Sequence, residues 1–223
     1  MSKNQRVHIV GISTRSGTTL LAESMGVCFD FDHTEGHEAD FDKFKWTKGS
    51  YLTKRPNELG LVHQRLKVDR RFWVIRMMRD PRDVVVSRHG KKLEDYWTEL
   101  DLWKEMLVHY RRVAAHPRFI TVRYEDLVSD PDGVQAKLDQ MLPFLTKTAD
   151  FSSYHTLAKP STGSLLAMRD VRQIDTSSIS NWKNHLPRIA GQIELYGSIS
   201  DILIEFGYEK DRSWEALLKG VEP

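Results

Sequence analysis

The sequence predicts an α/β fold in which helices cover both faces of a central parallel sheet, giving three layers (α/β/α). Three short apolar runs, at residues 6–12, 72–78 and 119–122, have the composition of buried strands. Segments with helical patterns alternate with these strands, and such alternation is typical of a parallel sheet. The chain has 223 residues, and we expect a single domain over residues 1–223.

The composition is that of an ordinary globular chain. Hydrophobic residues make up 40% and charged residues 29% of the sequence. The net charge of +2 is too small to indicate nucleic-acid binding, so we expect no nucleic-acid partner. Cys28 is the only cysteine, which excludes a disulfide framework and favours a reducing compartment.

The N-terminal residues lead directly into the first strand. No apolar stretch in the sequence is long enough for a signal peptide or a membrane span. We therefore expect a cytoplasmic protein with no integral membrane segment. The sequence gives no indication of the oligomeric state.

Further elements are predicted between and after these strands. A helix over 18–28 follows the first strand, and an irregular acidic stretch over 29–49 precedes a short strand at 51–53. Asn57 is expected to cap a helix over 58–67. The remaining predictions are an amphipathic helix over 96–115, a helix over 132–145, a long polar loop over 146–180, and a last helix from Pro187 to about Phe206, ended by Gly207.

The turn after the first strand has the composition of an anion-binding site. It reads Ser13-Thr14-Arg15-Ser16-Gly17-Thr18-Thr19 and opens a helix. Backbone N–H groups and the positive end of the helix converge there, and Arg15 adds a full charge. The Gly-Lys-Ser/Thr of a nucleotide-kinase loop is missing. The turn therefore predicts a phosphorylated or sulfated ligand; the alternative is an ordinary strand–helix turn that needs Gly17.

A second turn of the same kind follows the strand at 72–78. It reads Arg79-Asp80-Pro81-Arg82-Asp83 and also opens a helix. Arg79 stands at the carboxyl end of a parallel strand, where the ligand crevice of an open sheet lies. Ser87 is expected two helical turns further on, with its hydroxyl on the same face. The alternative is a charge cluster whose aspartates are favoured by the helix dipole.

Together, the two turns resemble the two cofactor signatures of the sulfotransferases that use 3′-phosphoadenosine 5′-phosphosulfate (PAPS), including their bacterial members. The first is similar to the Pro-Arg/Lys-Ser-Gly-Thr-Thr loop that holds the 5′-phosphosulfate, with Thr14 in place of the usual proline. The second is similar to the Arg-Asp-Pro-Arg-Asp-Val-x-x-Ser-Arg signature, whose leading Arg and Ser hold the 3′-phosphate. The resemblance implies a P-loop-type fold, PAPS as sulfuryl donor, adenosine 3′,5′-bisphosphate (PAP) as product, and no metal. It assigns to the cofactor Arg15, Ser16, Gly17, Thr18 and Thr19 at one end, and Arg79 and Ser87 at the other.

Three weaker matches keep the order of the same family, so that the resemblance covers about residues 7–208. Tyr124, in a Tyr-Glu-Asp-Leu segment, would lie near the adenine, although a core tyrosine is the alternative. A Trp-Lys-Asn-His segment begins at Trp182, and the upstream arginine that reaches the 3′-phosphate in relatives is Arg172 here, with Arg169 also near. A Lys-x-Pro element begins at Lys54, which would touch the transferred group; its alternative is a solvated lysine at a strand end.

The implied reaction is in-line transfer of a sulfuryl group from PAPS to a hydroxyl or amine of a small-molecule or sugar acceptor. The protein would mainly position the groups and neutralise charge, and Arg15 is placed to stabilise the leaving phosphate. The acceptor must lose a proton, which calls for a general base. We expect that base to be Glu38, then His37, then Glu35, with His63 as a further candidate; for each, a solvated or structural role is the alternative.

Other functions stay open from the sequence alone. Zinc bound by His33, His37 and the acidic residues around them is one alternative. A P-loop small-molecule kinase is another, although the kinase loop is missing. A relative that binds the nucleotide without turnover is a third, and a protein-interaction module using the tryptophan-rich helix at 97–110 is a fourth. The acceptor cannot be read, because its specificity lies in the loops at 29–50, 88–96 and 146–180.

Overall fold

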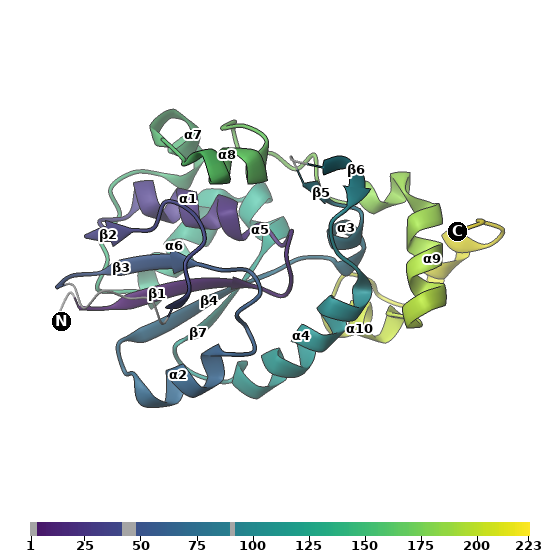
Figure 1. The fold of residues 1–223 in the computed structure, drawn as a ribbon, viewed down its shortest axis with the longest axis horizontal. Coiled ribbons are helices and arrows are strands. Elements are labelled where there is room, and N and C mark those ends of the chain that lie inside the picture. Colours follow the sequence, from purple (N-terminus) through teal and green to yellow (C-terminus); the bar gives the residue numbers. More distant parts are fainter. Residues whose placement is uncertain (1–3, 42–47, 90–91) are drawn as a thin grey trace.

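A parallel sheet forms the centre of the molecule in the computed structural model, which describes residues 4–41, 48–89 and 92–223. The five strands follow the order β2-β3-β1-β4-β7, and every neighbouring pair is parallel (Figure 1). Their bounds are β1 (Arg6–Gly11), β2 (His33–Thr34), β3 (Tyr51–Lys54), β4 (Phe72–Met78) and β7 (Phe119–Arg123). The prediction of an α/β fold with a central parallel sheet is confirmed.

Helices follow the strands along the chain. They are α1 (Thr18–Cys28), α2 (Val62–Val68), α3 (Pro81–Val85), α4 (Leu100–Val113), α5 (Tyr124–Ser129), α6 (Pro131–Met141), α7 (Tyr154–Leu157), α8 (Thr162–Met168), α9 (Leu186–Tyr196) and α10 (Ser200–Glu205). Short 3₁₀ segments lie at Phe151–Ser153, Asn181–Asn184 and Ser213–Leu218. A separate antiparallel hairpin joins β5 (Arg88–His89) to β6 (Lys92–Tyr96).

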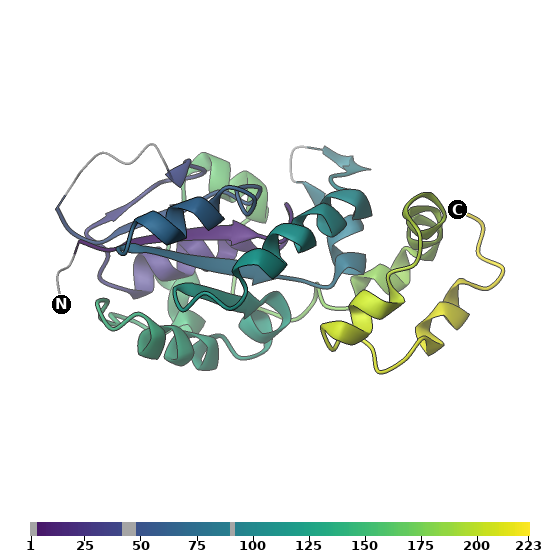
Figure 2. The same cartoon turned by 90° about the horizontal axis from the view of Figure 1, so that it is seen from below.

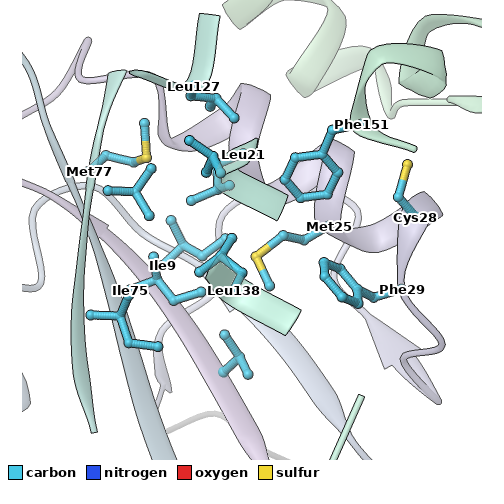
Figure 3. Close-up of a cluster of buried hydrophobic side chains, with 14 of the residues drawn as sticks. Ile9, Leu21, Met25, Cys28, Phe29, Ile75, Met77, Leu127, Leu138 and Phe151 are labelled. Carbon is cyan, nitrogen blue, oxygen red and sulfur yellow. The ribbon is translucent and has the colours of Figure 1, made fainter. Parts of the chain in front are cut away.

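The two central strands are buried on both faces, which explains why β1 and β4 are nearly continuous apolar runs. On one face, Ile9 and Ile75 pack against Leu21 and Met25 of α1 and Leu138 of α6 (Figure 3). On the other face, the cluster is made by Val10, Phe72 and Val74 with Leu66 of α2 and Trp103 of α4. The sheet therefore separates two cores, as a three-layer fold requires.

The C-terminal helices α9 and α10 lie beyond the carboxyl ends of the strands (Figures 1 and 2). Together with α3, α4 and two 3₁₀ segments, they form a third apolar cluster. Its tryptophans, Trp182 and Trp214 of the 3₁₀ segments, are both nearly fully buried. Among the described helices, none has both the length and the apolar character that a bilayer crossing requires.

Several predicted boundaries are wrong, each for a local reason. Asn57 caps no helix: residues 58–61 form a turn that buries Leu59, and α2 begins only at Val62. The helix predicted over 96–115 spans only α4, and Trp97 lies outside it with 42% of its surface exposed. The segment 146–180 contains α7 and α8 and is not one long loop. The last helix is split at Gly197, whose φ of 78° ends α9.

Candidate functional site

A cavity of about 990 Å³ opens where the parallel strands end. The chain after β1 contributes Arg15, the chain after β3 contributes Pro56, the chain after β4 contributes Arg79, and the residue after β7 is Tyr124. The carboxyl edge of an open parallel sheet is where such folds bind their ligands. Both predicted anion-binding turns therefore face the same space.

The first turn reaches its shape through left-handed backbone at two positions. Arg15 has a φ of 65° and Gly17 a φ of 90°. A Cβ atom on Gly17 would lie 2.4 Å from Cδ2 of Tyr124, so only glycine fits this position. Ser16 stabilises the turn, since its hydroxyl donates to the carbonyl of Ser13 over 2.8 Å. Gly17 stands at the N-cap of α1 and supplies no capping side chain, which leaves the first N–H groups of that helix directed into the cavity region.

The side chain of Arg15 is hydrogen-bonded to two other residues of the cavity wall. Its Nε donates to the hydroxyl of Ser87 over 3.1 Å, and its Nη1 donates to the carbonyl of Ala167 at the end of α8 over 3.2 Å. Burial, and then the nearby charges of Arg79 and Arg169, lower the pKa of Arg15 to about 10. Positive charge is thus concentrated at one place in the cavity wall.

Arg79 connects the two turns. Its Nη1 donates to the carbonyl of Arg15 and its Nη2 to the carbonyl of Ser178, each over 3.0 Å. The guanidinium also lies over the ring of Tyr124, with its central carbon 4.2 Å from the ring centroid. Only 7% of Arg79 is exposed, and its Nε has no hydrogen-bond partner among the described residues. The second turn therefore presents a rigidly held cation.

The other charged residues of the second turn are structural. Asp80 caps α3 by accepting from the N–H of Arg82 over 2.8 Å, and it also pairs with the Arg82 guanidinium. Asp83 accepts from the N–H groups of Ser180 and Trp182, although its burial raises the pKa of its carboxyl. These contacts anchor the segment that carries Ser178 over the cavity. Ser87 was predicted to lie two turns along the helix. That prediction is wrong, because α3 ends at Val85 and Ser87 lies beyond it.

Lys54 lies at the end of β3 with only 3% of its surface exposed. Its Nζ donates to the hydroxyl of Thr19 over 3.1 Å and to Oε1 of Glu38 over 3.3 Å. Burial lowers the pKa of Lys54, while Glu38 and Glu23 oppose that shift. The solvated lysine considered as an alternative is wrong: Lys54 is a buried cation that contacts the first turn.

Solved structures with a similar fold identify this architecture. A mouse sulfotransferase, SULT7A1, complexed with PAP, matches with a TM-score of 0.58 and 14% identity over 93% of this chain and 90% of that chain. The sulfotransferase domain from the curacin biosynthetic pathway matches with a TM-score of 0.56 and 13% identity, over 80% and 90%. The sulfotransferase domain from the Synechococcus PCC 7002 olefin synthase matches with a TM-score of 0.52 and 14% identity, over 82% and 89%.

The chain has the sulfotransferase fold. The resemblance seen in the two turns is thereby confirmed at the level of the fold. No family model matches the sequence, and no curated protein matches it either.

Within this sulfotransferase fold, the candidate bases lie at different places. Glu38 and His37 line the cavity, and 41% of the Glu38 side chain is exposed. Glu35 accepts a hydrogen bond from the hydroxyl of Tyr51 and lines a second, smaller cavity. His63 is on α2, which packs against the face of the sheet opposite to α1, and it lines neither cavity. In residues 4–41, 48–89 and 92–223, no three His, Cys, Asp or Glu side chains come close enough to hold a metal ion, so the zinc alternative has no site there.

Two further predicted cofactor residues, Tyr124 and Arg172, also line the cavity, whereas the predicted Ser16 is fully buried and does not line it. Tyr124 lies in the apolar core and in the cavity wall at once, with Arg79 covering its ring. Arg172 lines the cavity as an exposed side chain that pairs with Asp175 over 3.4 Å. Arg169 ends α8 with a φ of 72° and lies close enough to Arg15 to affect its charge.

Tyr154, which was not predicted from the sequence, lies in the same wall and is 1% exposed. It belongs to the stretch interpreted as a loop, so no helical pattern drew attention to it.

Proposed function

We propose that the protein transfers a sulfuryl group from PAPS to a hydroxyl or amine of a small-molecule or carbohydrate acceptor. The observation that supports this most directly is that the two cationic turns share one cavity. Arg79 donates to the carbonyl of Arg15, and Arg15 donates to the hydroxyl of Ser87. A nucleotide with anionic groups at both ends needs two such turns facing a common space.

The charge in the cavity suits that nucleotide. The hydrogen bonds of Arg15 and Arg79 go to carbonyl and hydroxyl oxygens, which leave the formal charge of each guanidinium in place. Burying two such charges side by side is costly unless an anion compensates them. The N–H groups at the uncapped start of α1 are further donors for anionic oxygens.

When bound, PAPS supplies the sulfuryl group and a phosphate leaving group. Arg15 and the N–H groups of Ser16 to Thr19 would hold its 5′ end, and Arg79 and Ser87 its 3′ end. These donors are fixed before the reaction, so they stabilise developing negative charge without reorganising. Tyr124 keeps the two turns in register, since its ring contacts both Gly17 and Arg79.

Glu38 and Lys54 form the proton-handling pair in this proposal. Lys54 is fixed by Thr19 and lies 3.3 Å from Oε1 of Glu38, so it orients that carboxylate at the 5′ end of the cavity. A partly exposed carboxylate at this position can take the proton of an incoming hydroxyl or amine. His37, which lines the same wall, is the second candidate.

The test measures nucleotide binding and transfer separately. PAP without metal is expected to raise the melting temperature, whereas ATP with magnesium is not. Labelled sulfate from PAPS is then expected to appear on members of an acceptor panel. Stabilisation by ATP with magnesium and not by PAP would replace this proposal with a kinase function. Tight PAP binding without transfer to any acceptor would indicate a nucleotide-binding relative.

A further inference from the structure

A second cavity of about 360 Å³ adjoins the first. Its walls come from the middle of α1, from β2 and β3, and from the start of α8. His37 lines both cavities. Lys54, in the wall of the second cavity, contacts Thr19 and Glu38, which line the first. A molecule in the second cavity would therefore meet the reacting end of the first at the Lys54–Glu38 pair.

The walls of the second cavity are rich in hydrogen-bond acceptors. Glu23 of α1 and Glu35 contribute carboxylates, while Thr34, Ser161 and Ser164 contribute hydroxyls. Glu23 is hydrogen-bonded to Ser164, and burial raises the pKa of its carboxyl. Two ammonium groups also line this cavity: that of Lys54, which is buried and engaged by Glu38, and that of Lys159, which is exposed. Such a wall suits a ligand that brings several O–H or N–H donors.

The size of the second cavity limits the size of the ligand that it can hold. Ligand pockets commonly occupy roughly 300–1,000 Å³, and a cavity of about 360 Å³ is at the small end of that range. It suits a single sugar ring better than a steroid or a polymer. Apolar atoms, from residues such as Leu52 and Leu157, make up about half of the wall and suit the C–H faces of such a ring.

We infer that this second cavity is the acceptor subsite, and that it takes a monosaccharide-sized polyol or amino sugar whose donors are bound by Glu23. The inference rests on the proposed function, because it assigns the acceptor of that reaction. The acceptor oxygen forms a bond to sulfur while the bond from sulfur to the bridging oxygen of PAPS breaks. The electron pair of that bond leaves with PAP, and the acceptor proton passes to Glu38.

The first experiment compares Glu23→Gln with the wild type. Transfer of labelled sulfate is measured with glucose, with 2-amino-2-deoxyglucose and with 4-nitrophenol as an apolar acceptor. The sugars are expected to be used in preference to the phenol. Glu23→Gln is expected to raise the KM for the sugar about tenfold, since it removes a charged hydrogen-bond acceptor, and to leave the Kd for PAP unchanged. Glu205→Gln is the matched control, because Glu205 is an exposed residue of α10 that pairs with Arg111.

A second variant tests the cavity by filling it. A Cβ on Gly26 would lie 3.6 Å from Cγ2 of Thr34, which is ordinary contact. Gly26→Leu is therefore expected to fold, to occupy the second cavity and to abolish transfer to the sugar while PAP still binds. Preference for the phenol, or an unchanged sugar KM in Glu23→Gln, would overturn the acceptor assignment alone. Failure of the wild-type protein to bind PAP would instead overturn the proposed function.

Discussion

The two cationic turns present their donors to the cavity through different parts of the chain. The first uses backbone: two left-handed residues and the start of an 11-residue helix direct N–H groups at one point. The second uses a side chain: α3 has only five residues, and Arg79 is fixed by two carbonyls and an aromatic ring. Arg15 is held differently: its two hydrogen bonds go to a hydroxyl and to a carbonyl at the end of α8.

This difference suggests separate roles for the two turns, one in nucleotide affinity and the other in turnover. A side chain that is already rigid adds affinity, since little further ordering is needed on binding. Backbone donors beside a fixed arginine suit the end of the ligand where charge would develop during the proposed reaction. We therefore expect substitutions in the first turn to act mainly on turnover and those in the second mainly on nucleotide affinity.

The largest effect on turnover is expected outside both turns. Glu38→Gln removes the proposed base but keeps the size of the side chain and its contact with Lys54. General-base catalysis typically contributes roughly 10²–10⁴ in rate, so kcat should fall by that order while the Kd for PAP stays the same. Steady-state kinetics with labelled PAPS measure kcat, and calorimetry measures the Kd for PAP. Full activity in this variant would exclude Glu38 as the base and favour His37. The His37→Gln variant would then be expected to show the fall in kcat.

Arg15→Ala is expected to act mainly on kcat. Removing one donor from a site of developing negative charge typically costs roughly 10²–10³ in rate. Arg15→Lys keeps the charge but not the planar fork, and it should recover part of the loss. If both variants lowered the affinity for PAP and left kcat unchanged, the first turn would have no special role in the reaction.

Arg79→Ala is expected to weaken PAP binding on the order of 100-fold, since hydrogen bonds to charged groups contribute about 1.5–3 kcal/mol each. Arg111→Ala is the control, because Arg111 forms an exposed pair with Glu205 and does not line the cavity. Circular dichroism should accompany the calorimetry, because Arg79 also holds Tyr124 and Ser178 in place. An unchanged Kd in a folded variant would contradict the assignment of the second turn.

Local sequence signals were sufficient for four of the five strands and for both turns, whereas β2 lies in the stretch predicted to be irregular. An apolar run that ends in glycine, serine and arginine is a contiguous pattern, so β1, β4 and the turns after them could be predicted. The polar residues inside buried elements could not. His8 lies in the middle of β1 and is completely buried, because Thr53 and Glu58 bind its ring. Those partners come from distant parts of the chain.

The candidate site was predictable only in part, because many of its contacts also join distant parts of the chain. The sequence gives no sign that Arg15 meets Ser87, or that Tyr124 lies between Gly17 and Arg79, because these contacts depend on how the strands are ordered. Glu23 was also missed. Its spacing of four residues from Thr19 places both on one face of α1, which was the available signal.

Gly17→Ala tests the backbone basis of the first turn. The left-handed backbone costs an alanine roughly 1 kcal/mol, and crowding against Tyr124 costs roughly 1 kcal/mol more. We expect the free energy of unfolding to fall by about 2 kcal/mol, measured by urea denaturation. Gly207→Ala is a matched control, since Gly207 also has a positive φ but a Cβ there would meet its nearest atom only at 3.9 Å. Equal losses in the two variants would exclude crowding as a cause.

The smallest effect is expected from Ser87→Ala, and it decides whether the two turns act together. The variant removes the hydroxyl that accepts from Nε of Arg15, a contact of about 0.5–1.5 kcal/mol. PAP affinity should therefore fall only about tenfold or less. A double-mutant cycle with Arg15→Ala isolates the coupling, which for groups in direct contact is about 0.5–3 kcal/mol. A coupling free energy of zero would show that each turn binds its own end of the nucleotide independently. A clear coupling would show that nucleotide binding at the second turn also positions the arginine that acts at the first.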